Sequence, residues 1–340
     1  MKFLRLFAGL CVPYAVMCVS PGGGIEMKDE MLKSRFGIEI EMTGITRSHA
    51  AEVVARTIGG TVEHRPYDGY DKRFIQLEDG RKWTVMSDSS IIARRTLDNG
   101  TRVDASSEYR VELVSPILTY EEDFEMLQSI VRALREAGAY ANQRLQCGIH
   151  IHLDGEPHNA KTIKNFINII ASKNDLLYKS LQITPERMRW CKKMDDSLVE
   201  KIKRRRPKTE EQIKKIWYEG YWGDTNEHYH DSRYHFLNLH SYFTGNHTVE
   251  LRGFNSELHA GKIRAYIILA LALNYQALTQ SGASSRKPQT ENEKFAMRTY
   301  LTRLGLNGDD YKSCRMHLCK HLNGTGAWRF GYPPKKKAIA

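Results

Sequence analysis

Short segments in which apolar and polar residues alternate are the clearest pattern along this chain. Alternation with a period of two is typical of β-strands, because successive side chains point to opposite faces of a sheet. Two further apolar runs, 74–77 and 83–86, flank the sequence EDGR at 78–81 and predict a hairpin. The other predicted strands are 36–42, 109–114, 148–153, 236–240 and 248–252.

A second pattern, with apolar residues three and four positions apart, predicts helices. Strands and helices follow one another without a regular βαβ rhythm, and the chain has neither a GxGxxG nor a GxxxxGK[ST] motif. We therefore expect the α+β class, without a P-loop or a dinucleotide-binding domain. The predicted helices are 49–58, 120–137, 160–181 and 259–278.

Composition narrows the class of protein. The 340 residues include 51 Lys and Arg against 40 Asp and Glu, a formal net charge of +11. A charged fraction of 27% and an apolar fraction of 41% exclude a disordered chain and a membrane protein of many spans. The basic excess suits a polyanionic partner, which could be nucleic acid or the phosphates of a nucleotide. Six cysteines without a CxxC pair exclude a disulfide scaffold, so we expect a cytoplasmic protein.

The two ends of the chain differ from its body. Lys2 and Arg5 precede an apolar run at 6–19 that resembles a signal peptide, although the cleavage pattern after it is poor. Residues 1–30 are therefore either a leader for export or an N-terminal extension from a start codon assigned too far upstream, and we favour the second explanation. Residues 282–340 are expected to form a small helical extension with a basic tail at 335–337.

The C-terminal extension contains Cys314 and Cys319, with His317 between them and His321 after them. A zinc site is one interpretation of this spacing. A helix with two buried thiols is the other, and we favour it.

Four predicted strands contain polar residues of unusual chemistry two positions apart. Side chains at that spacing lie on the same face of a strand. For a single strand, a solvated sheet face is the ordinary explanation, but such a face normally contains Lys, Thr and Ser. Here it would contain only acidic residues, histidines and arginines, which predicts a chemical site. The pairs are Glu39 and Glu41, Arg110 and Glu112, His150 and His152, and Glu250 and Arg252.

Convergence of these faces would place four carboxylates in one concavity. Like charges repel there and raise one another's pKa unless cations neutralise them. Divalent cations with oxygen ligands are the natural counter-charge, and Mg²⁺ suits a phosphate site. An arginine two residues from a carboxylate can bind a phosphate held by the same metal. The pattern therefore predicts a basin for ATP and Mg²⁺.

Five motifs follow one another along the chain: GIEIE at 37–41, ELVSP at 112–116, GIHIHL at 148–153, RYHFLNL at 233–239 and TVELRGFN at 248–255. In this order they resemble the amidoligase family, carboxylate–amine ligases of the glutamine synthetase and glutamate–cysteine ligase superfamily. The resemblance covers about residues 36–278 and implies a catalytic domain at 31–281. It also implies a curved, mainly antiparallel sheet with helices on its outer face, and ATP-dependent amide formation through an acyl phosphate.

The same resemblance implies roles for individual residues. His150 or His152 would contact metal, phosphate or the substrate carboxylate. Arg252 would bind the transferred phosphoryl group, and Arg233 and Asn238 would line the nucleotide or acyl-phosphate site. The implied Mg²⁺ ligands are Glu39, Glu41, Glu112 and Glu250.

One residue and one segment near the predicted site each have two interpretations. Asp88 is a candidate to accept the proton of the attacking amine, and an Asx-turn is an equally weighted role for it. Residues 227–231 (EHYHD) could form a metal cluster, but we favour a loop over the site.

Two functions from different classes remain. The first is an ATP- and Mg²⁺-dependent ligase that joins a small-molecule or peptide carboxylate to an amine. The second is a basic nucleic-acid- or protein-binding module that keeps the fold without the chemistry, with residues 192–217 as its charged surface. The presence of all four glutamates and Arg252 favours the ligase, and we do not expect nucleic acid as a partner. No sequence feature demands an oligomer.

Overall fold

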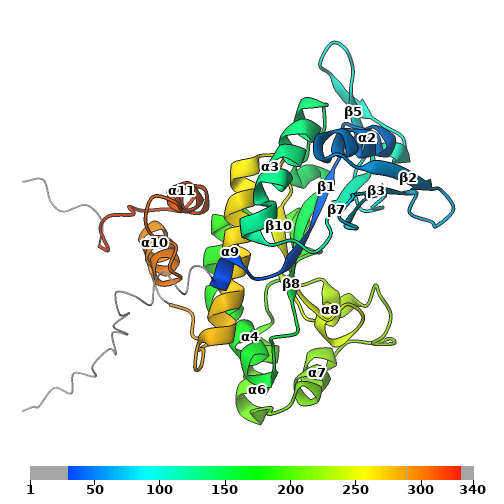
Figure 1. Cartoon of the computed structure of the whole chain (residues 1–340). Helices are drawn as coiled ribbons and strands as arrows, with labels where there is room; N and C mark the ends of the chain where they lie inside the picture. Colours follow the sequence, from blue (N-terminus) through cyan, green and yellow to red (C-terminus); the bar gives the residue numbers. More distant parts are fainter. Residues whose placement is uncertain (1–29, 289, 331–340) are drawn as a thin grey trace, which may run out of the picture.

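The computed structural model describes residues 30–288 and 290–330. The predicted leader at 1–30, except its last residue, and the basic tail at 335–337 lie outside the described residues. Within the described part, a large open sheet has helices packed against it (Figure 1). The predicted α+β class is confirmed.

The main sheet has eight strands, and every neighbouring pair in it is antiparallel. Strand β1 lies at its centre, between β7 and β8, which follow it much later in the chain. Strands β5 (Arg94–Thr96) and β6 (Arg102–Asp104) form a separate ribbon. The order across the main sheet is β2 (Thr61–Arg65), β3 (Lys72–Gln76), β4 (Lys82–Met86), β7 (Val111–Val114), β1 (Phe36–Met42), β8 (Gly148–Asp154), β10 (Thr248–Asn255) and β9 (Leu237–Asn238).

Strand β10 is longer than its alternating pattern predicted, because a bulge lies within it. The register with β8 shifts between Leu251 and Phe254. Gly253 lies in this bulge, where an added Cβ would come within 1.9 Å of the Phe236 ring. Only glycine fits such a close approach, so the bulge lets the strand bend and continue.

Strand β9 is shorter than predicted, and β2 was not predicted. The predicted strand at 236–240 is reduced to two residues because α8 (His240–Phe243) begins directly after it. All five residues of β2 are exposed, so no apolar alternation marks that strand.

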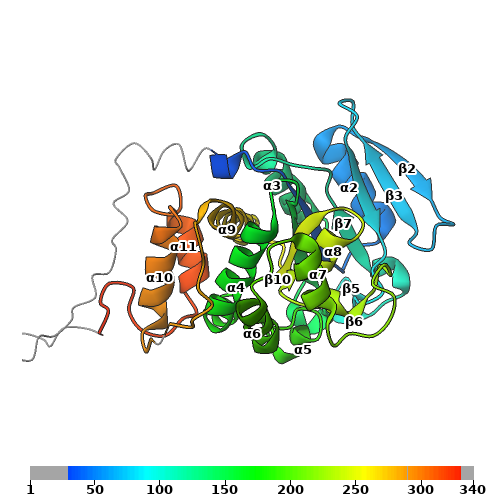
Figure 2. The same cartoon turned by 90° about the horizontal axis from the view of Figure 1, so that it is seen from below.

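Four long helices cover the apolar face of the sheet (Figures 1 and 2). They are α2 (Arg47–Ile58), α3 (Tyr120–Glu136), α4 (Ala160–Ser180) and α9 (Ala260–Thr279). Helix α4 begins with a capping box between Asn159 and Thr162, which satisfies backbone N–H groups at its N-terminus. The charged stretch 192–217 contains α6 (Asp196–Arg205) and α7 (Glu210–Tyr218).

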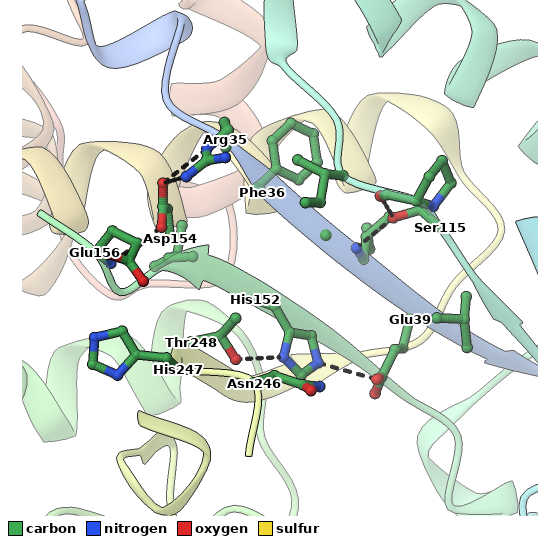
Figure 3. Close-up of a pocket in the computed structure, with 16 residues that line it drawn as sticks. Arg35, Phe36, Glu39, Ser115, His152, Asp154, Glu156, Asn246, His247 and Thr248 are labelled. Carbon is green, nitrogen blue, oxygen red and sulfur yellow. Dashed lines mark hydrogen bonds and ion pairs between the residues drawn. The ribbon is translucent and has the colours of Figure 1, made fainter. Parts of the chain in front are cut away.

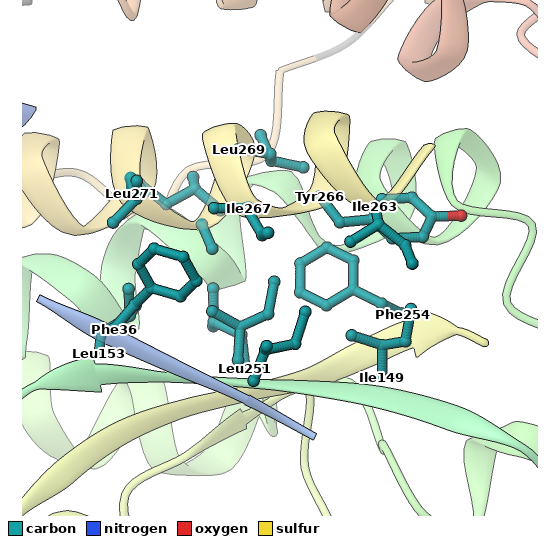
Figure 4. Packing of buried hydrophobic residues seen from close by; sticks show 14 of the residues in the cluster. Phe36, Ile149, Leu153, Leu251, Phe254, Ile263, Tyr266, Ile267, Leu269 and Leu271 are labelled. Atoms are coloured by element: carbon teal, nitrogen blue, oxygen red, sulfur yellow. The ribbon is translucent and has the colours of Figure 1, made fainter. Parts of the chain in front are cut away.

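The main core lies between the sheet and α9 (Figure 4). Phe36, Leu251 and Phe254 project from the strands toward Tyr266 and Ile267 of α9. The Phe254 and Tyr266 rings stack with their centroids 4.9 Å apart. Burial of these side chains is worth about 1.5–3 kcal/mol each.

Helix α9 is apolar around most of its circumference because it is covered on both sides. Leu269 projects away from the sheet (Figure 4), and α11 (Lys312–Cys319) packs on the outside of α9, next to α10 (Glu293–Arg303). Such an all-round apolar surface is typical of a buried helix. Even so, no helix in the described part of the chain is long and apolar enough to cross a bilayer.

The C-terminal cysteines lie in this outer layer. Cys314 of α11 is fully buried, and burial raises the pKa of Cys319 to about 11. Among the described residues, no group of three metal-binding side chains includes either cysteine. The structure therefore shows a helix whose cysteines pack against the core.

Candidate active site

The register of the central strands brings the predicted polar residues onto one sheet face. Glu39 of β1 pairs with His150 of β8, and Glu41 pairs with Glu112 of β7. Glu250 of β10 lies between His152 and Asn238, its partners on β8 and β9. Directly opposed residues on neighbouring strands share a face. Five strands therefore supply one polar surface, on the side of the sheet opposite α9.

His150 is the centre of this carboxylate cluster, which consists of Glu39, Glu41, Glu112, Glu250 and His150. Its Nδ1 lies 2.8 Å from Glu39 Oε2 and 3.6 Å from Glu250 Oε1. Its Nε2 lies 3.6 Å from Glu41 Oε1.

The cluster contains two groups of three ligand atoms. Within each group, the three atoms lie within 4.8 Å of one another. The first comes from Glu39, His150 and Glu250, and the second from Glu41, Glu112 and His150. Four carboxylates and one imidazole are suitable ligands for a hard divalent cation. The donor set therefore fits one or more such cations.

Electrostatic conditions differ sharply within the cluster. Burial raises the pKa of Glu112 well above its usual range, and the charges of Glu39, Glu41 and Asp88 add to the effect. Burial also raises the pKa of Glu41, although its carboxylate accepts a hydrogen bond of 2.6 Å from the Gly148 N–H. Negative charge is thus poorly compensated on the β7 side, where a cation would be bound most strongly.

On the β10 side, by contrast, the protein supplies its own positive charge. Burial opposes ionisation of Glu250, but Arg252 and the two histidines lower its pKa to about 2. Arg252 Nη1 donates to Glu250 Oε1 at 2.5 Å, and Asn238 Nδ2 donates to Oε2 at 2.6 Å. Burial likewise opposes protonation of His152, but Glu39 and Glu250 raise its pKa to about 9.

Loops from distant parts of the chain meet near the cluster. The Tyr70 hydroxyl, from the loop between β2 and β3, lies 2.7 Å from the Tyr229 hydroxyl. The guanidinium of Arg233, in the short 3₁₀ helix η3 (Asp231–Arg233), lies 5.3 Å from the Tyr229 ring and donates to the His228 carbonyl. Its Nε is buried without a hydrogen-bond partner among the described residues. The segment 227–231 is therefore a loop, as we favoured, and no group of three metal-binding side chains lies in it.

Asp88 forms an Asx-turn, which was one of the two roles predicted for it. Its Oδ1 accepts a 2.6 Å hydrogen bond from the Ser90 N–H, which is the geometry of an Asx-turn. Its charge also raises the pKa of both Glu41 and Glu112, so Asp88 lies close to the cluster. The turn holds Asp88 beside the site.

Residues 32–274 match the family model described as "Putative amidoligase enzyme". The chain belongs to the amidoligase family. No curated protein matches the chain. The matched region includes every strand of the main sheet and nearly all of α9, so all five residues of the cluster lie inside it. The family points to a ligase.

Sequence reasoning missed one buried arginine of this amidoligase. Arg187 lies in the short helix α5 (Pro185–Met188) and is 2% exposed. Its guanidinium occupies the space beside Gly148, where a Cβ would come within 2.2 Å of it. It donates to the carbonyls of Gln146 and Arg252, but its Nε has no partner among the described residues. No local pattern marks this arginine, since only the fold brings α5 to the start of β8.

Arg110 was expected to share a sheet face with Glu112. Strand β7 begins one residue later, at Val111, and Arg110 instead ends the short 3₁₀ helix η1 (Ser107–Tyr109). Its carbonyl accepts a hydrogen bond from Arg47. Arg252 is thus the arginine that contacts the cluster directly among the described residues.

A cavity of about 440 Å³ adjoins the cluster at Glu39, and His152 lines it as well (Figure 3). It follows the same polar face toward the start of β1 and the end of β8. Its volume is in the range of small-molecule sites.

Proposed function

We propose that this amidoligase is an ATP- and Mg²⁺-dependent carboxylate–amine ligase that works through an acyl phosphate. We also propose that its sheet is of the glutamine synthetase and glutamate–cysteine ligase type. The observation that supports the proposal most strongly is the cluster of four glutamates around His150, with Arg252 against it. Carboxylates, a divalent cation and an arginine are what phosphoryl transfer requires.

Each residue of the cluster has a role that its surroundings support. Glu39, Glu41, Glu112 and Glu250, with His150, would hold Mg²⁺. When bound, the metal would neutralise the charge of the nucleotide phosphates. Arg252 and Arg233 would bind the transferred phosphoryl group, and Asn238 would orient Glu250 through its 2.6 Å hydrogen bond. Protonated His152 would attract the substrate carboxylate or a phosphate oxygen.

The proposed reaction has two steps. A carboxylate is a poor acylating agent, since oxide is a bad leaving group. Its oxygen therefore attacks the γ-phosphorus of ATP, the bond to the β-phosphate oxygen breaks, and ADP leaves. The neutral amine then attacks the carbonyl carbon of the acyl phosphate, the C–O bond breaks, and inorganic phosphate leaves. We assign to Asp88 the acceptance of the amine proton, because its turn holds it beside the cluster.

The proposal extends to the organisation of the chain. Residues 31–281 would be the catalytic domain of a cytoplasmic enzyme, and 282–340 an extension that packs on α9 through α11. The substrates would be a small-molecule or peptide carboxylate and an amine.

The test is ADP and phosphate release from ATP and Mg²⁺, with a panel of carboxylates and amines. Glu250→Gln should lower the rate at least about 100-fold, because it removes a ligand and the partner of Arg252. Glu136→Gln, at the exposed end of α3, is the matched control and should keep the wild-type rate.

Nucleotide binding should also require Mg²⁺. Absence of Mg²⁺-dependent nucleotide binding would refute the proposed ligase function. Strongly salt-dependent DNA binding without ATP turnover would instead favour the binding module.

A further inference from the structure

Four strands and the loops next to them line the cavity beside the cluster. The start of β1, the ends of β7 and β8 and the start of β10 contribute, together with residues 115–117 and 246–247. Of the cluster residues, Glu39 lines the cavity, and so does His152, whose Nε2 lies 3.1 Å from Glu39 Oε1 (Figure 3). The cavity is thus a separate compartment with one end at the proposed reaction centre.

Gly37 keeps this compartment open. It lies opposite His152 in the register of β1 and β8, on the same face as Glu39. A Cβ added at Gly37 would have the His152 Cβ and the Ser115 Oγ as its nearest neighbours, both at 3.8 Å. This is ordinary van der Waals contact, so a side chain could be accommodated without strain and would occupy the cavity.

The charges of the lining favour a cation. Arg35 is held by Asp154, whose Oδ2 accepts hydrogen bonds of 2.9 Å from its Nε and 2.6 Å from its Nη2 (Figure 3). Glu156 is exposed, and no cationic side chain of the described residues lies within ion-pair distance of it. Its negative charge is therefore available to a ligand.

An apolar surface lies next to these charges. The Ile117 side chain, 64% exposed, and Pro116 line the same cavity. A ligand with a positively charged group and a short aliphatic body matches both features. A carboxylate matches them less well, because Arg35 is already paired with Asp154 and His152 Nε2 already lies 3.1 Å from Glu39 Oε1.

We propose that this cavity is the binding site for the amine substrate, a primary amine that enters as an ammonium ion with an aliphatic body. The site lies where the nitrogen of a bound amine can reach the cluster past Glu39. The assignment names a substrate site of the proposed ligase and rests on that function.

The experiment is calorimetric titration of the full chain with n-butylamine and, separately, with butyrate, without nucleotide or Mg²⁺. Wild type should bind n-butylamine and not butyrate. Gly37→Val should weaken amine binding at least about tenfold, since its side chain fills the cavity. Glu156→Gln should weaken it about threefold, as expected for one exposed charge. Glu136→Gln should bind the amine like wild type, and thermal unfolding checks that each variant is folded.

Three outcomes would overturn the assignment: binding of butyrate in place of the amine, binding of neither, or amine binding that Gly37→Val and Glu156→Gln leave unchanged. Since the titrations contain no nucleotide, they are independent of the ATP-dependent reaction. Amine binding without Mg²⁺-dependent nucleotide binding would refute the proposed ligase and leave the cavity an amine site. The converse result would refute only the amine site.

Discussion

Replacement of Glu112 by glutamine should stabilise the protein without metal and weaken its response to Mg²⁺. Glu112 is 6% exposed, and its nearest ligand atom lies within 4.8 Å of Glu41 and His150. Two ionised carboxylates at that separation repel by about 3.5 kcal/mol at an effective dielectric constant of about 20. Arg252 offsets part of this repulsion, so we expect a net gain of about 1–3 kcal/mol from Glu112→Gln.

The gain should depend on pH in a defined direction. Burial and the neighbouring charges raise the pKa of Glu112 in the folded state. Its destabilising effect is therefore absent below the pKa of the unfolded chain, about 4.3, and grows as the pH rises. The advantage of Glu112→Gln should be larger at about pH 8 than at about pH 5.

Urea unfolding in chelator and in excess Mg²⁺ measures both effects. Wild type should gain stability from Mg²⁺ through binding to the folded state, and Glu112→Gln should gain much less. The control Glu136→Gln should match wild type in both buffers. If Glu112→Gln is less stable than wild type in chelator, or if Mg²⁺ stabilises both equally, the electrostatic account of the cluster is refuted.

Three further predictions concern packing, acid stability and the loops above the site. Gly253→Ala should lower the free energy of unfolding by about 1–3 kcal/mol, because its Cβ would clash with Phe236; an unchanged urea midpoint would contradict this. Burial opposes ionisation of Asp71, but two arginines and a histidine together hold its pKa well below the usual range. The stabilisation from Asp71 is therefore present above about pH 4 and lost on acidification. Asp71→Asn should flatten the acid limb of stability against pH, and an identical limb would argue against the ion pairs. Tyr229→Phe removes the hydrogen bond with the Tyr70 hydroxyl. It should change the free energy of unfolding by less than about 0.5 kcal/mol but increase the rate of proteolysis in the loop that contains residue 229. Equal cleavage rates in the variant and wild type would show that the contact does not restrain the loop.

Local pattern was sufficient to predict the central strands and the face on which their polar residues lie. The alternation in FGIEIEM and GIHIHL places Glu39 and His150 on one face and isoleucines on the other, because side-chain direction along a strand has a period of two. The observed strands have this arrangement, and the apolar face packs on α9. The metal, nucleotide and substrate roles of the polar residues stay predictions.

Several features could not be predicted because they depend on contacts between distant segments. Arg187 reaches the site only because α5 packs at the start of β8. Strand β2 is held by pairing with β3 and has no apolar pattern of its own. The bulge at Gly253 and the meeting of Tyr70 with Tyr229 likewise require the folded sheet.

Within each central strand, the sequence by itself determined which side chains share a face, because that follows from backbone geometry one residue at a time. Where the strand begins was not determined in the same way, since Arg110 lies before β7. Only the tertiary structure decided which of these side chains touch, because the strand order β7-β1-β8-β10 joins segments far apart in the chain. The tertiary structure also shifts the pKa values of two glutamates in opposite directions. The pKa of Glu39 is lowered because, against the effect of burial, it lies beside two histidines, and the pKa of Glu112 is raised because it is buried among acidic residues. The cavity over Gly37 has the same origin: a glycine in a strand becomes a binding compartment only when neighbouring strands and a loop enclose the space it leaves.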